Sequence, residues 1–106
     1  MNGSIELAGA SGARYRYTPL EEHRAVPPSG ANFVLAERTA EGLKLIYAGE
    51  TDNLANPAWR AKLEEARRTR AHVQVLTRLN VTRAVREAER SDLVQEHHPP
   101  MNQSPN

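Results

Sequence analysis

Hydrophobic and polar residues alternate, or form short apolar runs, in four stretches of this chain, which is typical of β-strands. The stretches are residues 13–18, 32–37, 43–48 and 72–79. In the first of them Tyr15 and Tyr17 fall on one side and arginines on the other, which predicts a half-exposed strand. The second and third are joined by a short turn, so we expect them to form an antiparallel hairpin.

A longer stretch shows the spacing of about 3.6 residues that an amphipathic helix requires. It runs from Pro57 to about Arg70, and its apolar stripe is Trp59, Leu63 and Ala66. Asn56 fits the N-cap of this helix, and a proline is tolerated in its first turn. Because Trp59 heads the stripe, we expect it to anchor the core rather than to stack on a ligand.

A second helix is predicted after the last strand. It begins between Asn80 and Thr82 and ends before Pro99, because the residue ahead of a proline is pushed out of the helical region. Its approximate apolar stripe consists of Val81, Val85, Ala88 and Leu93. The predicted order is therefore an N-terminal strand followed by strand, strand, helix, strand and helix.

The chain length of 106 residues corresponds to one domain. Pro27-Pro28-Ser29-Gly30 is a loop signal, so we separate an N-terminal strand with a Pro-rich loop (1–29) from a domain at 30–102 and a tail at 103–106. The chain has no cysteine, which excludes disulfides, thiolate metal sites and cysteine nucleophiles. No apolar run is long enough to span a membrane, and no signal peptide is expected, so the predicted location is the cytoplasm.

Charge is unevenly distributed along the chain. The net charge is +1, but residues 60–90 contain nine Lys or Arg and four acids, a net +5 that leaves −4 for the remainder. A basic middle segment is compatible with a polyanionic partner. It is equally compatible with two solvated, arginine-rich helix faces.

Two groups of short motifs bear on function. Tyr47-Ala48-Gly49 ends a predicted strand and precedes Asn53-Leu54 at the start of a helix, and Asp92-Leu93-Val94 precedes Pro99-Pro100-Met101-Asn102. In their order and spacing these motifs resemble the GIY-YIG nuclease superfamily. The chain looks like a diverged member of the small, stand-alone bacterial type. The resemblance covers roughly residues 30–102. It implies an α/β (α+β) fold with a small three-stranded antiparallel sheet flanked by helices, here with an extra N-terminal strand.

The resemblance also implies a catalytic site for hydrolysis of nucleic acid. Family members use two strand tyrosines, an arginine early in the first helix, and a glutamate that binds Mg²⁺. Here Phe33 occupies the position of the first tyrosine, whose hydroxyl is lost, and Tyr47 the position of the second. Arg60 is the candidate arginine, one turn after Pro57, which holds the family's usual position. Glu89 is the candidate metal ligand, although an alignment without gaps places Arg90 there.

Each of these residues also has a purely structural interpretation. Tyr47 could pack a core edge, Arg60 could be a surface arginine, and Glu89 could be a solvent-facing partner of Arg83 or Arg86. His97 and His98 are adjacent and fit a helix C-terminus, which favours cations, better than a metal site. We expect Asn102 to order the C-terminal loop through hydrogen bonds to the backbone.

Three functions remain open from the sequence. The first is a metal-dependent endonuclease with a degenerate site built from Tyr47, Arg60 and Glu89. The second is a catalytically inactive module that binds nucleic acid, with DNA favoured, through Arg60, Lys62, Arg67 and Arg68. The third is a protein-interaction domain with the same fold, because a fold does not determine a function.

Overall fold

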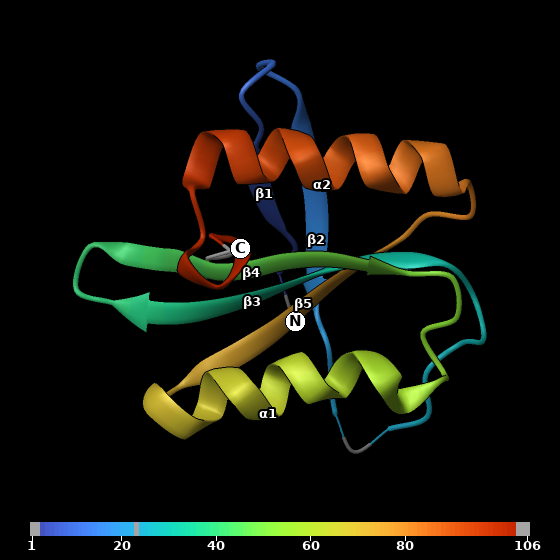
Figure 1. Ribbon diagram of the computed structural model, residues 1–106, viewed down its shortest axis with the longest axis horizontal. Coiled ribbons are helices and arrows are strands. Elements are labelled where there is room, and N and C mark those ends of the chain that lie inside the picture. Colours follow the sequence, from blue (N-terminus) through green and yellow to red (C-terminus); the bar gives the residue numbers. More distant parts are fainter. Residues whose placement is uncertain (1–2, 23, 104–106) are drawn as a thin grey trace.

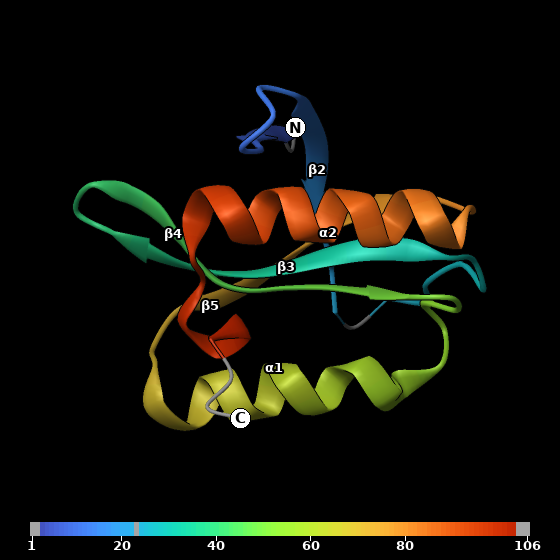
Figure 2. The ribbon, with the colours of Figure 1, turned by 45° about the horizontal axis from the view of Figure 1, so that its top comes forward.

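The computed structural model describes residues 3–22 and 24–103, which form a curled antiparallel sheet with a helix on each face (Figures 1 and 2). The strands are β1 (Ile5–Ala8), β2 (Arg14–Pro19), β3 (Ala31–Thr39), β4 (Gly42–Thr51) and β5 (Val73–Leu79). The helices are α1 (Arg60–Thr69) and α2 (Arg83–His97), with short 3₁₀ turns η1 (Pro57–Trp59) and η2 (Pro100–Asn102). Asn56 caps η1 by accepting a hydrogen bond from the Ala58 amide, which confirms the predicted helix start.

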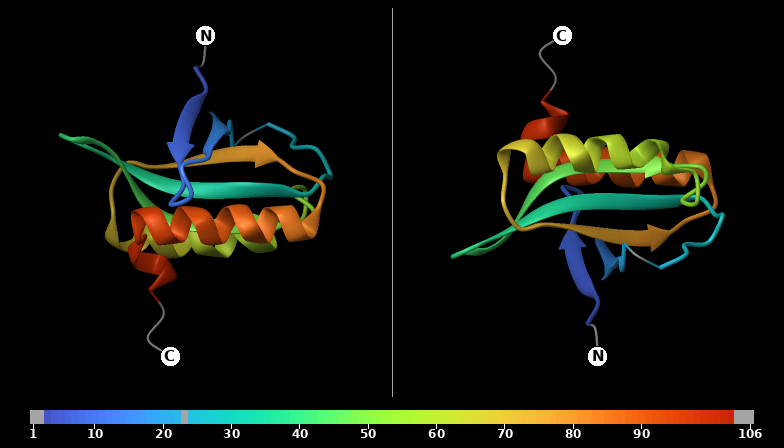
Figure 3. Two further views of the ribbon diagram at one scale, coloured as in Figure 1. Left: turned by 90° about the horizontal axis from the view of Figure 1, so that it is seen from above. Right: turned by 90° about the horizontal axis from the view of Figure 1, so that it is seen from below.

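The prediction of a three-stranded sheet flanked by helices is wrong, because the sheet has five strands in the order β1-β2-β5-β3-β4. β2 joins the sheet by pairing with β5 through Thr18↔Thr77 and Pro19↔Leu76, and β1 then pairs with β2. Figure 3 shows this N-terminal hairpin at the opposite edge of the sheet from η2. Tyr17 explains the addition physically, since its fully buried side chain extends the core beyond β5.

Two apolar clusters lie on the two faces of the sheet. The first packs under α1 around Phe33, Trp59 and Leu63, and the second packs under α2 around Tyr17, Leu76 and Leu93. Trp59 is 6% exposed, which confirms that it anchors the core. Neighbouring side chains of the central strand β3 therefore face α1 and α2 in turn.

The apolar stripe predicted for α2 is correct at Leu93 but wrong at Val81, Val85 and Ala88. Val81 and Val85 are 80% and 51% exposed, whereas Arg86, Glu89 and Leu93 are buried against the sheet. Two charged side chains can be buried here because each has an oppositely charged partner and further hydrogen bonds. Periodicity of apolar residues could not reveal a helix face whose buried positions are partly ionic.

The N-terminal segment is part of the same sheet as the rest of the chain. β1, which the sequence did not predict, contributes Leu7 to the cluster under α2. Of the predicted tail at 103–106, residues 104–106 lie outside the described residues. No helix among the described residues is both long and apolar enough to cross a membrane.

Candidate functional site

A β-bulge determines where Tyr47 points. The register of β3 with β4 shifts between Leu35 and Ala36, so that Leu35 faces Tyr47, Ala36 faces Leu45, and Ile46 is the extra residue. A bulge of this kind re-aims the side chains beside it. Ile46 and Tyr47 consequently both pack on the α1 face, although they are adjacent in the sequence.

Three aromatic side chains form a row on the α1 face, which we call the aromatic row. The Phe33 ring centre lies 5.8 Å from that of Tyr47 and 5.1 Å from that of Trp59. Phe33 and Trp59 are buried, and Tyr47 is partly exposed at one end of the row. Phe33 thus fills the centre of a packed cluster, where a tyrosine hydroxyl would need a polar partner.

A cation lies over each end of the aromatic row. The Arg60 guanidinium carbon lies 4.7 Å from the Trp59 ring centre, and the Lys62 Nζ lies 5.2 Å from that of Tyr47. Lys62 also approaches Glu65 at 3.7 Å, whereas Arg60 forms no ion pair within the part of the chain that the structure describes. The structure therefore brings together the predicted residues Phe33, Tyr47, Arg60 and Lys62.

Gly49 is required by the packing of the aromatic row. A Cβ atom at this position would lie 2.6 Å from a Phe33 ring carbon and 2.7 Å from a Tyr47 ring carbon. Both distances are shorter than any ordinary contact, so only glycine allows both rings to lie over the strand. This gives the Tyr47-Ala48-Gly49 motif a structural role in addition to any functional one.

Asn102 fastens the C-terminal turn to the edge strand next to Tyr47. Its Oδ1 accepts a hydrogen bond from the Ala48 amide at 2.8 Å, and its Nδ2 donates one to the Ala48 carbonyl at 3.0 Å. The side-chain amide therefore pairs with β4 as a neighbouring strand would. The prediction that Asn102 orders this loop through backbone hydrogen bonds is confirmed.

Glu89 is a buried residue of α2, whereas Arg60 begins α1 and Tyr47 packs against the cluster under α1. The two helices lie on opposite sides of the sheet (Figure 1), so the sheet separates Glu89 from Tyr47 and Arg60. Its Oε2 accepts a hydrogen bond from the Tyr17 hydroxyl at 2.6 Å, and its Oε1 accepts one from Arg78 Nε at 3.0 Å. Burial and the neighbouring Glu89 carboxylate raise the pKa of Tyr17 far above its ordinary value. The interpretation of Glu89 as a solvent-facing partner of Arg83 or Arg86 is wrong.

These bonds decide whether Glu89 fits the Mg²⁺ that the resemblance implies. Mg²⁺ binds carboxylate oxygens in nearly ideal octahedral geometry and keeps several waters. Both Glu89 oxygens already have protein partners, one of them cationic, and the residue is 2% exposed. Moreover, no group of three His, Cys, Asp or Glu among residues 3–22 and 24–103 could hold a metal ion. The residues at this position do not fit the metal.

The two remaining predicted basic residues lie near the C-terminus of α1. Arg67 binds the Glu22 carboxylate with two hydrogen bonds of 2.9 and 2.8 Å and donates a third to the Val73 carbonyl. The guanidinium of Arg67 is therefore already bound within the protein. Arg68 is exposed on the helix surface.

A second polar cluster, which the sequence did not indicate, joins the N-terminal hairpin to α2. Asp92 accepts hydrogen bonds from the Tyr15 hydroxyl at 2.7 Å and from Ser11 Oγ and amide at 2.7 and 2.8 Å. The bond from Tyr15, followed by those from Ser11, lowers the pKa of Asp92, whereas burial and Asp92 raise that of Tyr15 to about 12. The partners lie about 80 residues apart, so no local pattern could reveal them.

Comparison of the chain with protein-family models, curated proteins and solved structures finds no match.

Proposed function

We propose that this protein is a diverged relative of GIY-YIG domains that binds nucleic acid, with DNA favoured, without hydrolysing it. The binding surface consists of Arg60 and Lys62, which contact phosphates, and the exposed edge of Tyr47 beside Lys62. The observation that carries the proposal is that both cations are held over the aromatic row. The proposal includes a cytoplasmic location. A chain without cysteine forms no disulfide and therefore needs no oxidising compartment.

The contacts of the two cations support phosphate binding. A cation packed on an aromatic ring retains its charge and its hydrogen-bond donors, while its long side chain is partly ordered before a ligand arrives. Phosphate contacts supply most of the affinity of non-specific nucleic-acid binding. Arg67 is not included in the surface, because Glu22 and Val73 already engage its guanidinium.

The same geometry argues against hydrolysis. The resemblance places the metal-binding carboxylate at Glu89, whose oxygens are bonded to Tyr17 and Arg78 on the other face of the sheet. The hydroxyl of the first strand tyrosine is absent at Phe33. A binding role needs neither group, so binding is the function that the arrangement supports best.

The test is a titration of fluorescein-labelled single-stranded and duplex DNA with the purified protein. We expect the double variant Arg60→Glu, Lys62→Glu to weaken binding by more than tenfold, because it replaces two phosphate contacts by two repulsions. The matched control is Arg38→Glu, Lys44→Glu, which makes the same change of charge at exposed positions of the β3–β4 hairpin. The control should lose far less affinity than the double variant.

Two results would reject parts of the proposal. No affinity for either DNA at low salt would reject nucleic-acid binding and favour the protein-interaction alternative. Nicking of supercoiled plasmid in Mg²⁺ or Mn²⁺, abolished by chelator and by Tyr47→Phe, would show that the domain is catalytic after all.

A further inference from the structure

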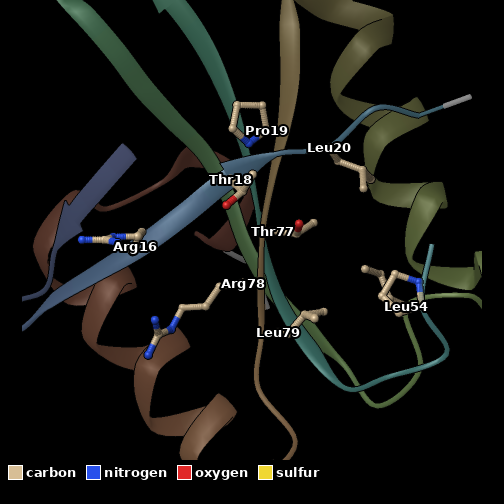
Figure 4. A pocket seen from close by; sticks show the side chains of 9 residues that line it. Arg16, Thr18, Pro19, Leu20, Leu54, Thr77, Arg78 and Leu79 are labelled. Atoms are coloured by element: carbon tan, nitrogen blue, oxygen red, sulfur yellow. The ribbon is translucent and has the colours of Figure 1, made fainter. Parts of the chain in front are cut away.

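A cavity of about 490 Å³ opens where β2 crosses β5. β2 and β5 pair at only two positions, Thr18↔Thr77 and Pro19↔Leu76, and beyond them the strands diverge. The cavity occupies the angle between the diverging strands (Figure 4). Its volume is within the range of sites that hold small molecules.

The lining of this cavity is divided into a cationic side and an apolar side. Figure 4 shows Arg16 and Arg78 on one side of β5 and Leu20 and Leu54 on the other. The hydroxyl-bearing residues Thr18 and Thr77 lie between them, and Pro19, Pro27 and Leu79 complete the lining. A ligand that matches this division has an anionic group at one end and an apolar body at the other.

Arg16 leaves its positive charge available to a ligand, and Arg78 leaves hydrogen-bond donors. Arg16 is exposed and forms no ion pair with any described residue. Arg78 uses its Nε for Glu89, and no hydrogen bond within the described ranges engages its two terminal nitrogens. Guanidinium groups bind phosphate through two parallel hydrogen bonds, and threonine hydroxyls can add further ones.

We propose that this cavity binds a phosphomonoester whose apolar body is about the size of one aromatic ring. The phosphate lies against Arg16, Arg78 and the two threonines, and the ring lies against Leu54 and Leu79. None of the cavity residues belongs to the proposed DNA-binding surface, although the carbonyl of Leu54 accepts a hydrogen bond from Trp59 Nε1. The two sites can therefore be tested with separate variants.

Phenyl phosphate is the probe, compared with inorganic phosphate, benzoate and phenol in calorimetric titrations. We expect saturable binding of phenyl phosphate, weaker binding of inorganic phosphate and benzoate, and none of phenol. Arg16→Gln should weaken phenyl phosphate by roughly tenfold, because it removes a charge-assisted contact. Leu79 is 58% exposed. Leu79→Asn should lower the affinity for phenyl phosphate and leave the affinity for inorganic phosphate unchanged.

Arg14→Gln is the matched control, since Arg14 lies on the same strand but does not line the cavity. Equal weakening by Arg14→Gln and Arg16→Gln would mean attraction to diffuse surface charge and would overturn the proposal. Absence of saturable binding to the unmodified protein would overturn it as well. In that protein, amide chemical shifts of Thr18 and Thr77 should move with phenyl phosphate, and shifts confined to α1 would contradict the assigned site.

Discussion

At the scale of single residues, the role of a carboxylate is determined by the hydrogen bonds that it accepts. Two buried or partly buried carboxylates, those of Glu89 and Asp92, show this. Glu89 was a metal-ligand candidate by its place in the sequence, but inside the protein Arg78 neutralises its charge and Tyr17 donates a hydrogen bond to its second oxygen. Asp92, part of the motif at the end of the second helix, instead fastens the N-terminal hairpin through Tyr15 and Ser11. Both carboxylates therefore act as structural acceptors.

The Tyr17 hydroxyl should contribute measurably to stability. Tyr17→Phe leaves one oxygen of the buried Glu89 carboxylate without its partner, so we expect the free energy of unfolding to fall by about 2 kcal/mol. Urea denaturation followed by circular dichroism measures this loss. Tyr47→Phe is the control, because no hydrogen bond within the described residues uses the Tyr47 hydroxyl, and it should change stability by less than about 0.5 kcal/mol. Equal losses in the two variants would contradict the role assigned to the Tyr17–Glu89 bond.

Asp92 should make stability depend on pH in the acidic range. Its pKa in the folded protein lies below the ordinary value of 3.8, so the unfolded chain takes up a proton first as the pH falls. The stabilisation is therefore fully present well above pH 3.8 and is lost as the pH falls through the lower, folded value. Urea titrations should show that the unmodified protein has a larger free energy of unfolding than Asp92→Asn at about pH 7. The difference between the two free energies should shrink towards about pH 3. A difference that stays constant over this range would contradict the assignment.

At the scale of elements, the C-terminal turn and the edge strand depend on one side chain. Asn102 provides both hydrogen bonds to the Ala48 backbone, and Ala48 itself is 1% exposed. In Asn102→Ala we expect the Ala48 amide to lose most of its protection from hydrogen exchange, because this amide of an edge strand loses its acceptor and the shortened side chain lets water reach it. Amides in the middle of β3 should keep theirs. Unchanged protection of Ala48 would show that another group satisfies it.

The elements that the sequence predicted correctly are those with regular local patterns. The hairpin of β3 and β4, helix α1 after Asn56, and strand β5 follow from alternation, a capping residue and a single apolar stripe. The bulge at Ile46 and the buried face of α2 have no such local signal, because they depend on pairing with distant residues. For the same reason the α2 stripe through Val81 and Val85 was wrong.

At the scale of the whole molecule, the N-terminal hairpin changes both the sheet and the sites it carries. β2 extends the sheet beyond β5, buries Tyr17 against Glu89, and creates the cavity beside Thr18. Local alternation predicted β2 as a strand but could not identify its neighbour. Its partner positions on β5 lie about 60 residues further along the chain, and neither segment contains a sequence pattern that indicates the pairing. The grouping of Tyr47, Phe33 and Arg60 was anticipated through the resemblance, whereas the separation of Glu89 from them was not.

Fewer basic side chains are available to bind an anion than the composition of the molecule suggests. Of the basic residues between 60 and 90, five are within ion-pair distance of an acid: Lys62, Arg67, Arg78, Arg83 and Arg86. Exposed pairs of this kind are weak and can open for a phosphate, but the pairs of Arg78 and Arg86 involve buried side chains. The proposed nucleic-acid binding therefore depends on a few positions beside the aromatic row: Arg60, which has no ion pair with a described residue, and Lys62, whose pair with Glu65 is exposed.

Phosphate binding by Arg60 and Lys62 predicts how the affinity for DNA depends on salt concentration. The dissociation constant for a labelled duplex is measured between about 50 and 200 mM salt for the unmodified protein and for Arg60→Gln, Lys62→Gln. We predict that the unmodified protein binds with an affinity that falls steeply with salt, and that the slope of the logarithmic plot decreases by roughly two in the double variant, because two phosphate contacts are lost. Binding with an identical slope in the two proteins would contradict the account, because the phosphates would then be held elsewhere.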